Sequence, residues 1–328
     1  MIIIKTPFRI SFFGGGTDFP KYYNKNQGCV IGTTINKYCY ISIRKLENIF
    51  NYKYRIVWSK NEIINKPSDS ENPIVNASIS EINPKKNLEI HFQADLPKNS
   101  GLGSSSAFCV GILNGLLKIK GVSLNKKKIA KLAIKIEQKI LNEFCGVQDQ
   151  IWSSYGGMNF ITFKKQNKFT VRKLRITKTK KKNLEENLLL MFTEKQRYSK
   201  EIEKSKQKDI KNKFIFLDEI KKLTLKSKKI LEGNENINKF GELLNQYWTL
   251  KKKLSNKVSN NYLDKIYNKI IKSGAIGAKL LGSGGGGFFL IYCNKKKQKY
   301  LKKKLNRFKF VNFKFSNSGS EIIYSKEN

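Results

Sequence analysis

Residues 96–107 carry the clearest chemical pattern in the chain, Leu-Pro-Lys-Asn-Ser-Gly-Leu-Gly-Ser-Ser-Ser-Ala. Gly101 and Gly103 permit backbone conformations that bring N–H groups close to a ligand. The apolar run that follows predicts a helix, whose first turn adds unpaired donors and the positive end of a dipole. This combination suits a phosphate, and the serine hydroxyls can cap the helix or coordinate Mg²⁺. The segment is not a Walker A loop, because no Gly-Lys-Ser or Gly-Lys-Thr closes it, and an ordinary glycine turn with a serine N-cap is the alternative.

Three segments in the same order resemble the motifs of the GHMP kinases, the family of galactokinase, homoserine kinase, mevalonate kinase and phosphomevalonate kinase. They are residues 7–18, 97–107 and 277–287, so the resemblance spans almost the whole chain. Three ordered motifs are far more specific than any single one. The resemblance implies ATP as phosphoryl donor and Mg²⁺ as cofactor. It also implies that the second motif binds the nucleotide through Pro97, Gly101, Leu102, Gly103, Ser104, Ser105 and Ser106.

The resemblance gives roles to several polar residues. Asp149 matches the catalytic aspartate of sugar-kinase members, where a carboxylate takes or orients the proton of the acceptor hydroxyl. Arg9 matches a basic residue beside it, whose fixed charge would stabilise the ionised acid and the developing phosphoryl charge. Glu137 and Ser105 match the Mg²⁺ ligands. If the resemblance is set aside, the alternative interpretation is that Asp149 is a helix cap, Glu137 is a solvated charge and Arg9 is a surface residue of an edge strand.

The first motif bears on the acceptor. Asp18 matches the acid that grips sugar hydroxyls in galactokinase-like members. Galactokinase carries Glu-His where this chain has Gly15 and Gly16, so two sugar-binding side chains are lost and space is opened. Galactose is therefore disfavoured, and the Gly-Gly-Gly-Thr-Asp form resembles the branch whose members phosphorylate a heptose 7-phosphate or L-fucose. We also assign Thr17 and Gly284 to the substrate site.

A second feature of that branch is a Thr-Gly-x-x-Arg-x-Ser segment, which residues 193–199 resemble with Glu194 in place of glycine. Arg197 at this junction between a strand and a helix would bind a distal phosphate of the substrate bidentately. A solvated arginine at a helix start is the alternative.

The elements that must position these residues are predicted from periodicity and turn residues. In the first half we expect a surface stretch at 67–84, helices at 105–118 and 125–144, and strands at 2–4, 7–13, 29–34, 38–43, 54–58, 88–93 and 158–164. Gly111 and Gly115 share one helix face and would let another element approach closely. After a Lys-rich linker at 177–183, we expect polar helices and strands at 188–193, 277–281, 288–293 and 308–315.

These elements predict an α+β architecture of mixed, largely antiparallel sheets in two lobes. The resemblance implies the GHMP kinase fold, with a ribosomal-protein-S5-domain-2-like lobe at the N-terminus and a ferredoxin-like lobe at the C-terminus. We place an ATP-binding domain at 1–178 and the C-terminal kinase domain at 184–328.

The amino-acid composition further limits the kinds of protein that this chain can be. The chain of 328 residues carries a formal net charge of +40, but the basic residues are spread in short runs without an RNA-binding signature, zinc finger or basic zipper. A solvated, Lys-rich surface explains this better than a nucleic-acid site. The five scattered cysteines favour a reducing compartment. His91 is the only histidine and lies in an alternating stretch, which favours a place on a strand face. No apolar run reaches the ~18 residues of a membrane span.

We therefore expect a cytoplasmic sugar kinase that binds neither nucleic acid nor membrane, with a homodimer left open. Its reaction would be phosphorylation of the anomeric C1 hydroxyl of D-glycero-D-manno-heptose 7-phosphate, which gives the 1,7-bisphosphate. The enzymatic alternative is an L-fucose-type or other sugar 1-kinase of the same family. The alternative from a different class is a basic nucleic-acid-binding protein or a nucleotide-binding protein without catalysis.

Overall fold

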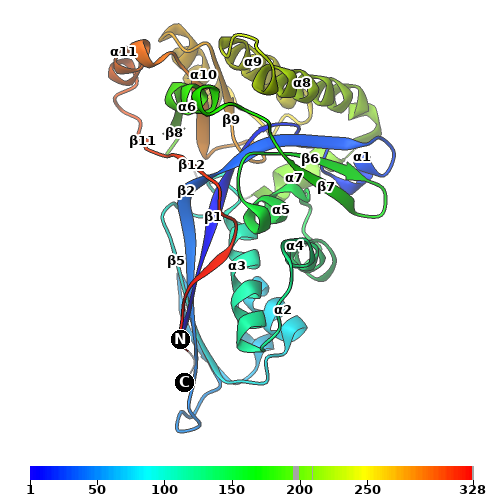
Figure 1. Cartoon of the computed structure of the whole chain (residues 1–328), viewed down its shortest axis with the longest axis vertical. Helices are drawn as coiled ribbons and strands as arrows, with labels where there is room; N and C mark the ends of the chain where they lie inside the picture. The colour runs from blue at the N-terminus through cyan, green and yellow to red at the C-terminus, as the bar shows by residue number, and fades with distance from the viewer. Residues whose placement is uncertain (195–198, 209, 327–328) are drawn as a thin grey trace.

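Two long antiparallel strands, β1 (Ile2–Phe13) and β2 (Gly28–Lys45), form the axis of the molecule. The computed structural model describes residues 1–194, 199–208 and 210–326. Both strands run from the lower lobe to the base of the upper lobe in Figure 1. The two strands expected at 29–34 and 38–43 are one continuous strand, because the residues between them keep the extended conformation.

β1 and β2 belong to a nine-stranded sheet whose strand order is β13-β1-β2-β5-β3-β4; β12 and β6 also pair with β2, and β7 pairs with β6. All its pairs are antiparallel except β3 with β5. The end of the chain, which we placed in the second domain, supplies two strands of this sheet. The remaining strands are β3 (Tyr54–Val57), β4 (Asn61–Ile64), β5 (Leu88–Ala94), β6 (Asn159–Lys164), β7 (Lys168–Lys173), β12 (Phe315–Ser316) and β13 (Glu321–Ser325).

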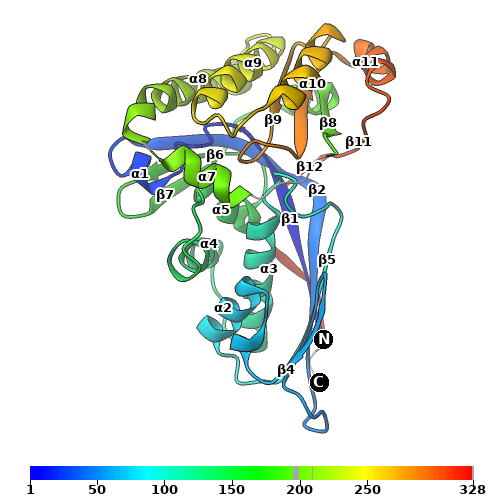
Figure 2. The ribbon, with the colours of Figure 1, turned by 180° about the vertical axis from the view of Figure 1, so that it is seen from behind.

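Helices cover one face of this sheet, as both views of the ribbon show (Figures 1 and 2). Helix α3 approaches the sheet closely: a Cβ added to Gly111 would lie 2.8 Å from Thr6 Oγ1, and one on Gly115 would lie 2.6 Å from Ile4 Cδ1. The predicted close approach is thus confirmed. The helices are α1 (Pro20–Tyr23), η1 (Pro67–Asp69), α2 (Pro73–Ile82), α3 (Ser104–Ile119), α4 (Lys126–Ile134), η2 (Lys135–Ile140) and α5 (Gln148–Tyr155).

Three local predictions were wrong. The expected surface stretch 67–84 contains helix α2, which Asn72 caps through bonds from the Ile74 and Val75 amides and which buries an apolar face. The expected linker 177–183 lies mostly in helix α6, because the Thr177 side chain caps it. The expected strand at 308–315 is two separate pairs of residues, one in each sheet.

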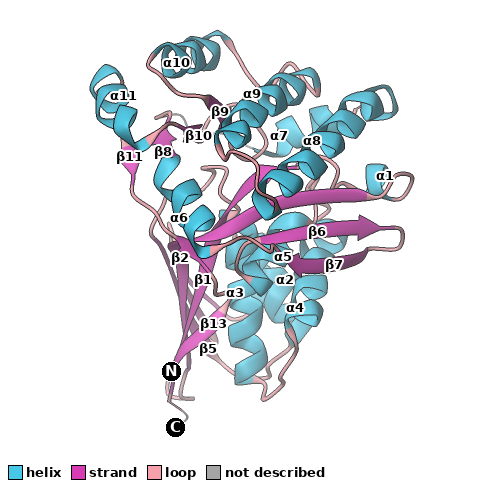
Figure 3. Cartoon of the chain, turned by 45° about the horizontal axis from the view of Figure 1, so that its top comes forward, coloured by secondary structure: helices cyan, strands magenta, loops and turns pink. Residues whose placement is uncertain are grey.

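The second lobe is a four-stranded antiparallel sheet of order β11-β8-β10-β9 with helices around it (Figure 3). Its strands are β8 (Leu188–Phe192), β9 (Gly277–Leu280), β10 (Phe288–Tyr292) and β11 (Phe310–Val311). Its helices are α6 (Lys178–Asn187), α7 (Ser199–Gln207), η3 (Ile210–Lys213), α8 (Phe214–Glu232), α9 (Asn238–Lys253), α10 (Asn261–Lys272), η4 (Lys295–Lys297) and α11 (Gln298–Lys304).

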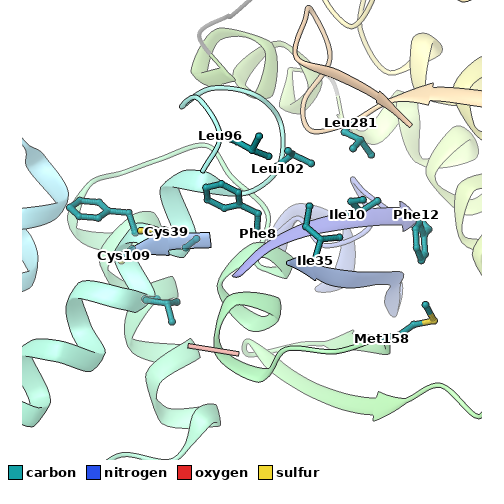
Figure 4. Close-up of a cluster of buried hydrophobic side chains, with 14 of the residues drawn as sticks. Phe8, Ile10, Phe12, Ile35, Cys39, Leu96, Leu102, Cys109, Met158 and Leu281 are labelled. Atoms are coloured by element: carbon teal, nitrogen blue, oxygen red, sulfur yellow. The ribbon is translucent and has the colours of Figure 1, made fainter. Parts of the chain in front are cut away.

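The lobes share a hydrophobic core. Phe12 of β1 packs edge-on against Phe240 of α9, with ring centroids 5.3 Å apart. In Figure 4 the side chains of Leu102 and Leu281, from the second and third motifs, lie above β1 in the same buried cluster. The three motifs are therefore held against one another by burial of apolar surface. Among the described helices, none is long and apolar enough to cross a bilayer.

Candidate active site

The turn before α3 has the backbone geometry expected of a phosphate-binding loop. Gly101 and Gly103 have φ of +85° and +77°, values that side chains other than glycine rarely adopt. Gly103 is the N-cap of α3, and no side chain caps the helix. The alternative of a serine-capped turn is therefore wrong, and the first-turn N–H groups of α3 are left for a ligand.

The third motif packs directly on this loop. A Cβ on Gly101 would lie 2.8 Å from the Leu281 carbonyl oxygen, and one on Gly287 would lie 2.3 Å from that of Ser100. The run 282–287 is therefore glycine-rich because two backbones touch there. Gly282 and Ser283 line the cleft, whereas Gly284 packs on the backbone of Val258 away from it.

Arg9 and Asp149 form a bidentate ion pair at the edge of the loop. Arg9 Nε donates to Asp149 Oδ1 at 2.7 Å, and Nη2 donates to Oδ2 at 2.5 Å. Arg9 Nη1 also donates to the Gly101 carbonyl at 2.7 Å, so one guanidinium links the carboxylate to the phosphate loop. β1 is an inner strand, and its register against β2 shifts beside Arg9, an irregularity that re-aims side chains near active sites.

Glu137 lies in η2, a π-helical turn that extends α4 and ends at Ile140, short of the predicted 144. Its carboxylate accepts from Ser106 Oγ at 2.8 Å and from the Gln150 side-chain amide. Burial raises the pKa of Glu137 to about 7. The hydroxyl that contacts Glu137 is thus that of Ser106, whereas Ser105, which we expected there, is exposed one position earlier on α3. All three serines of the motif line the cleft.

Asp18 is buried at the other end of the cleft. Its Oδ1 accepts from the Gly16 amide at 2.8 Å, and its Oδ2 accepts from Gln148 Nε2 at 3.0 Å. Burial raises the pKa of Asp18 to about 6. Gly146 lies so close that a Cβ there would be 1.8 Å from Oδ2. A chain segment beside Asp149 therefore packs on the acid of the first motif.

These residues line one cleft of about 1180 Å³ between the lobes, which includes solvent at its mouth. Gly15, Gly16 and Asp18 stand on its wall together with Arg9, Asp149 and the phosphate loop. Some predicted site residues do not: Thr17 is buried with its hydroxyl bonded to the Gly14 and Cys29 carbonyls, and Pro97 and Leu102 are absent from the wall. Arg197 lies outside the described residues.

Sequence reasoning missed the cleft residues of the second lobe, Glu203, Lys206, Tyr247, Lys251 and Lys279. Lys279 is 2% exposed, and its Nζ donates to the Ser11 and Phe12 carbonyls and lies 4.0 Å from the ring centroid of Tyr247. The available signal was its place in the apolar strand 277–280, where every residue is buried.

Comparisons with known proteins agree with this geometry. Residues 73–157 match the model of the GHMP kinases N terminal domain, and residues 225–311 match that of the GHMP kinases C terminal domain. A D-glycero-alpha-D-manno-heptose 7-phosphate kinase of Campylobacter jejuni is 32% identical over 314 residues, which are 92% of this chain and 92% of that protein. The chain belongs to the GHMP kinase family.

Solved structures of similar proteins extend the likeness to the fold. One, described as a D-glycero-D-manno-heptose 1-phosphate kinase from Bacteroides thetaiotaomicron, has a TM-score of 0.80 at 23% identity and covers 99% of this chain and 100% of its own. A putative sugar kinase from Campylobacter jejuni has a TM-score of 0.73 at 26% identity, over 98% and 97% of the two chains. The predicted two-lobed GHMP kinase fold is confirmed, and this GHMP kinase is a phosphotransferase with a hydroxyl acceptor.

Proposed function

We propose that this GHMP kinase uses ATP and Mg²⁺ to phosphorylate the anomeric C1 hydroxyl of D-glycero-D-manno-heptose 7-phosphate. The product would be the 1,7-bisphosphate, a precursor of nucleotide-activated heptose for surface polysaccharide. The observation that carries the proposal is the single cleft in which the bidentate Arg9–Asp149 pair adjoins an uncapped helix start. The 32% identity to the heptose 7-phosphate kinase of Campylobacter jejuni supports the choice of acceptor.

In the proposed reaction, the phosphate loop binds ATP and Asp149 acts on the acceptor hydroxyl. The first-turn amides of α3 would hold the phosphates of ATP, which places the γ-phosphorus near the loop. Asp149 would accept the proton of the C1 hydroxyl while the C1 oxygen bonds to the γ-phosphorus. In the same step, the bond between that phosphorus and the oxygen of the departing ADP breaks. Arg9 holds the carboxylate by two hydrogen bonds and offsets charge that develops on the phosphoryl group.

The donor set near the loop fits Mg²⁺. Glu137 supplies a carboxylate and the serines supply hydroxyls, which are the hard oxygen ligands this ion prefers. No group of three or more His, Cys, Asp or Glu side chains that could hold a metal ion exists among the described residues, so substrate phosphates and water would complete the shell. We assign Glu137 and Ser106 as ligands, with Ser105 as the neighbouring candidate. When bound, the ion would neutralise charge on the phosphates of ATP.

The two glycines of the first motif do not leave open space, contrary to our expectation. A Cβ on Gly15 would lie 3.0 Å from the Tyr247 hydroxyl, and one on Gly16 would lie 2.9 Å from Leu217 Cδ2, so second-lobe side chains occupy this space. Asp18 and Gln148 are the polar side chains beside this surface and are suited to sugar hydroxyls.

The test is ADP release with heptose 7-phosphate, free heptose, mannose 6-phosphate, fucose and galactose as acceptors, with the product assigned by phosphorus NMR. We expect the highest kcat/KM and an anomeric phosphate with heptose 7-phosphate. Faster turnover of fucose would move the function to a fucose-type kinase. Asp149→Asn should lower kcat about 10²-fold or more while an ATP analogue still binds, and near-normal turnover would remove Asp149 from the mechanism.

A further inference from the structure

Three buried lysines stand on the wall that the second lobe contributes to the cleft. Lys206 of α7, Lys251 of α9 and Lys279 of β9 are 7%, 4% and 2% exposed, and all line the cleft. Each of these lysines has a partner within the fold: Glu203 pairs with Lys206 at 3.2 Å, and backbone carbonyls accept from Lys251 and Lys279. An ammonium group has three N–H donors, so three buried lysines on one wall are suited to bind a further acceptor, such as the oxygens of an anionic ligand.

Lys279 lies beside the first motif, and Lys206 lines the same cleft. Lys279 donates to the Ser11 and Phe12 carbonyls, and its neighbour Tyr247 donates to the Gly15 carbonyl at 3.3 Å. Burial lowers the pKa of Lys279, and the charges of Arg9 and Lys206 lower it further.

Helix α7 is held in place by the second lobe, so the position of Lys206 is built into the fold. Ile202 is buried in the core of this lobe, and Ser205 hydrogen-bonds Ser255 at 2.8 Å. Lys213 Nζ donates to the Ser205 and Lys206 carbonyls at the end of the helix. Figure 2 shows α7 at the junction of the lobes, between α5 and the helices α8 and α9.

A second observation points to a ligand on the same wall. The hydroxyl of Ser283 is buried without a hydrogen-bond partner among the described residues, although Ser283 lines the cleft. Buried hydroxyls are nearly always bonded, so an oxygen of a bound molecule is the expected partner.

We propose that Lys206, together with Lys279, forms a subsite for a phosphate monoester that the acceptor sugar carries in addition to the hydroxyl that is phosphorylated. This inference rests on the proposed function and adds the residues that bind the second phosphate. The phosphates of ATP have their own donors at the start of α3, next to the loop whose Gly101 carbonyl accepts from Arg9. On binding, the sugar phosphate would take over from Glu203 as the charged partner of Lys206.

The test is calorimetric binding of heptose 7-phosphate and of free heptose to the full chain, with a non-hydrolysable ATP analogue present. Lys206→Met should raise the Kd of the phosphorylated sugar about 10- to 100-fold, the usual cost of a lost charged hydrogen bond, and that of free heptose far less. Lys206→Arg should restore most of the difference. Lys204→Met is the matched control, because Lys204 is exposed on the same helix.

Each other outcome has a definite meaning. Equal weakening of both sugars, or weaker binding of the ATP analogue alone, would overturn the subsite. Absence of ADP release by the wild-type protein with every acceptor would refute the proposed function instead. The subsite would then be judged by the same variants with mannose 6-phosphate against mannose, where loss of the preference for phosphate in Lys206→Met supports it and an unchanged preference rejects it.

Discussion

Replacement of Asp18 by asparagine should stabilise the unliganded protein at neutral pH while it weakens sugar binding. The carboxyl group is 1% exposed and accepts from the Gly16 amide and the Gln148 side chain, and no basic side chain among the described residues bonds to it. Burial raises its pKa from 3.8 to about 6. At pH 7 the folded protein must therefore hold a buried, ionised and unpaired carboxylate.

The sign and size follow from linkage. Because the folded pKa lies above the unfolded one, the folded state binds more protons between about pH 4 and 6, and stability falls as pH rises through that window. The shift corresponds to about 3 kcal/mol at neutral pH, of which about 2 kcal/mol is lost between pH 4.5 and 7.5. Asparagine does not ionise, so the variant does not lose this stability as the pH rises. Its amide can be accommodated if the Gln148 amide rotates, since the Ser11 hydroxyl that now donates to Gln148 can also accept.

Urea unfolding at pH 4.5 and 7.5 measures the effect. The free energy of unfolding of Asp18→Asn should exceed that of the wild type by about 1–3 kcal/mol at pH 7.5, and the difference should shrink by about 2 kcal/mol at pH 4.5. Glu137 has a pKa shift of the same sign but is present in both proteins. Asp69→Asn, at an exposed acid, should show no such pH dependence. A difference that is the same at both pH values would refute the reasoning.

Three further substitutions test other parts of the site. Glu137→Gln should raise the Mg²⁺ concentration for half-maximal activity about 10-fold, and an unchanged titration would exclude Glu137 as a ligand. Gly146→Ala should lower the free energy of unfolding by about 2 kcal/mol or more, because the new Cβ would meet Asp18 Oδ2 at 1.8 Å; wild-type stability would show that the two segments separate freely. Glu194→Gly should raise the free energy of unfolding by about 0.5–1 kcal/mol, because Glu194 has a φ of +60°. Glu194→Ala, the control, should bring no such gain.

The motif-bearing segments were predictable because their backbones are locally determined. Glycines at 101 and 103 followed by an apolar run specify a loop that enters a buried helix, and the structure has that loop. The errors fell where side chains decide an element end. Asn72 starts α2 inside a stretch expected to lie on the surface, and Thr177 starts α6 inside an expected linker. In both places a single cap residue outweighed the composition of its surroundings.

Long-range packing accounts for what sequence could not supply at the site. Whether Ser105 or Ser106 meets Glu137 depends on the rotation of α3 against η2, which no local pattern specifies. Lys206 and Lys251 are hidden among the many lysines of polar helices, and only the docking of those helices buries them. Lys279 is different, because a lysine in the fully buried strand 277–280 must find polar partners inside the protein. It finds them in the carbonyls of β1, so the strand that carries Arg9 is tied to the second lobe at the acceptor side of the cleft. A lysine flanked on both sides by apolar strand residues thus predicts a buried polar contact. Counting every lysine as a surface charge overlooks this contact.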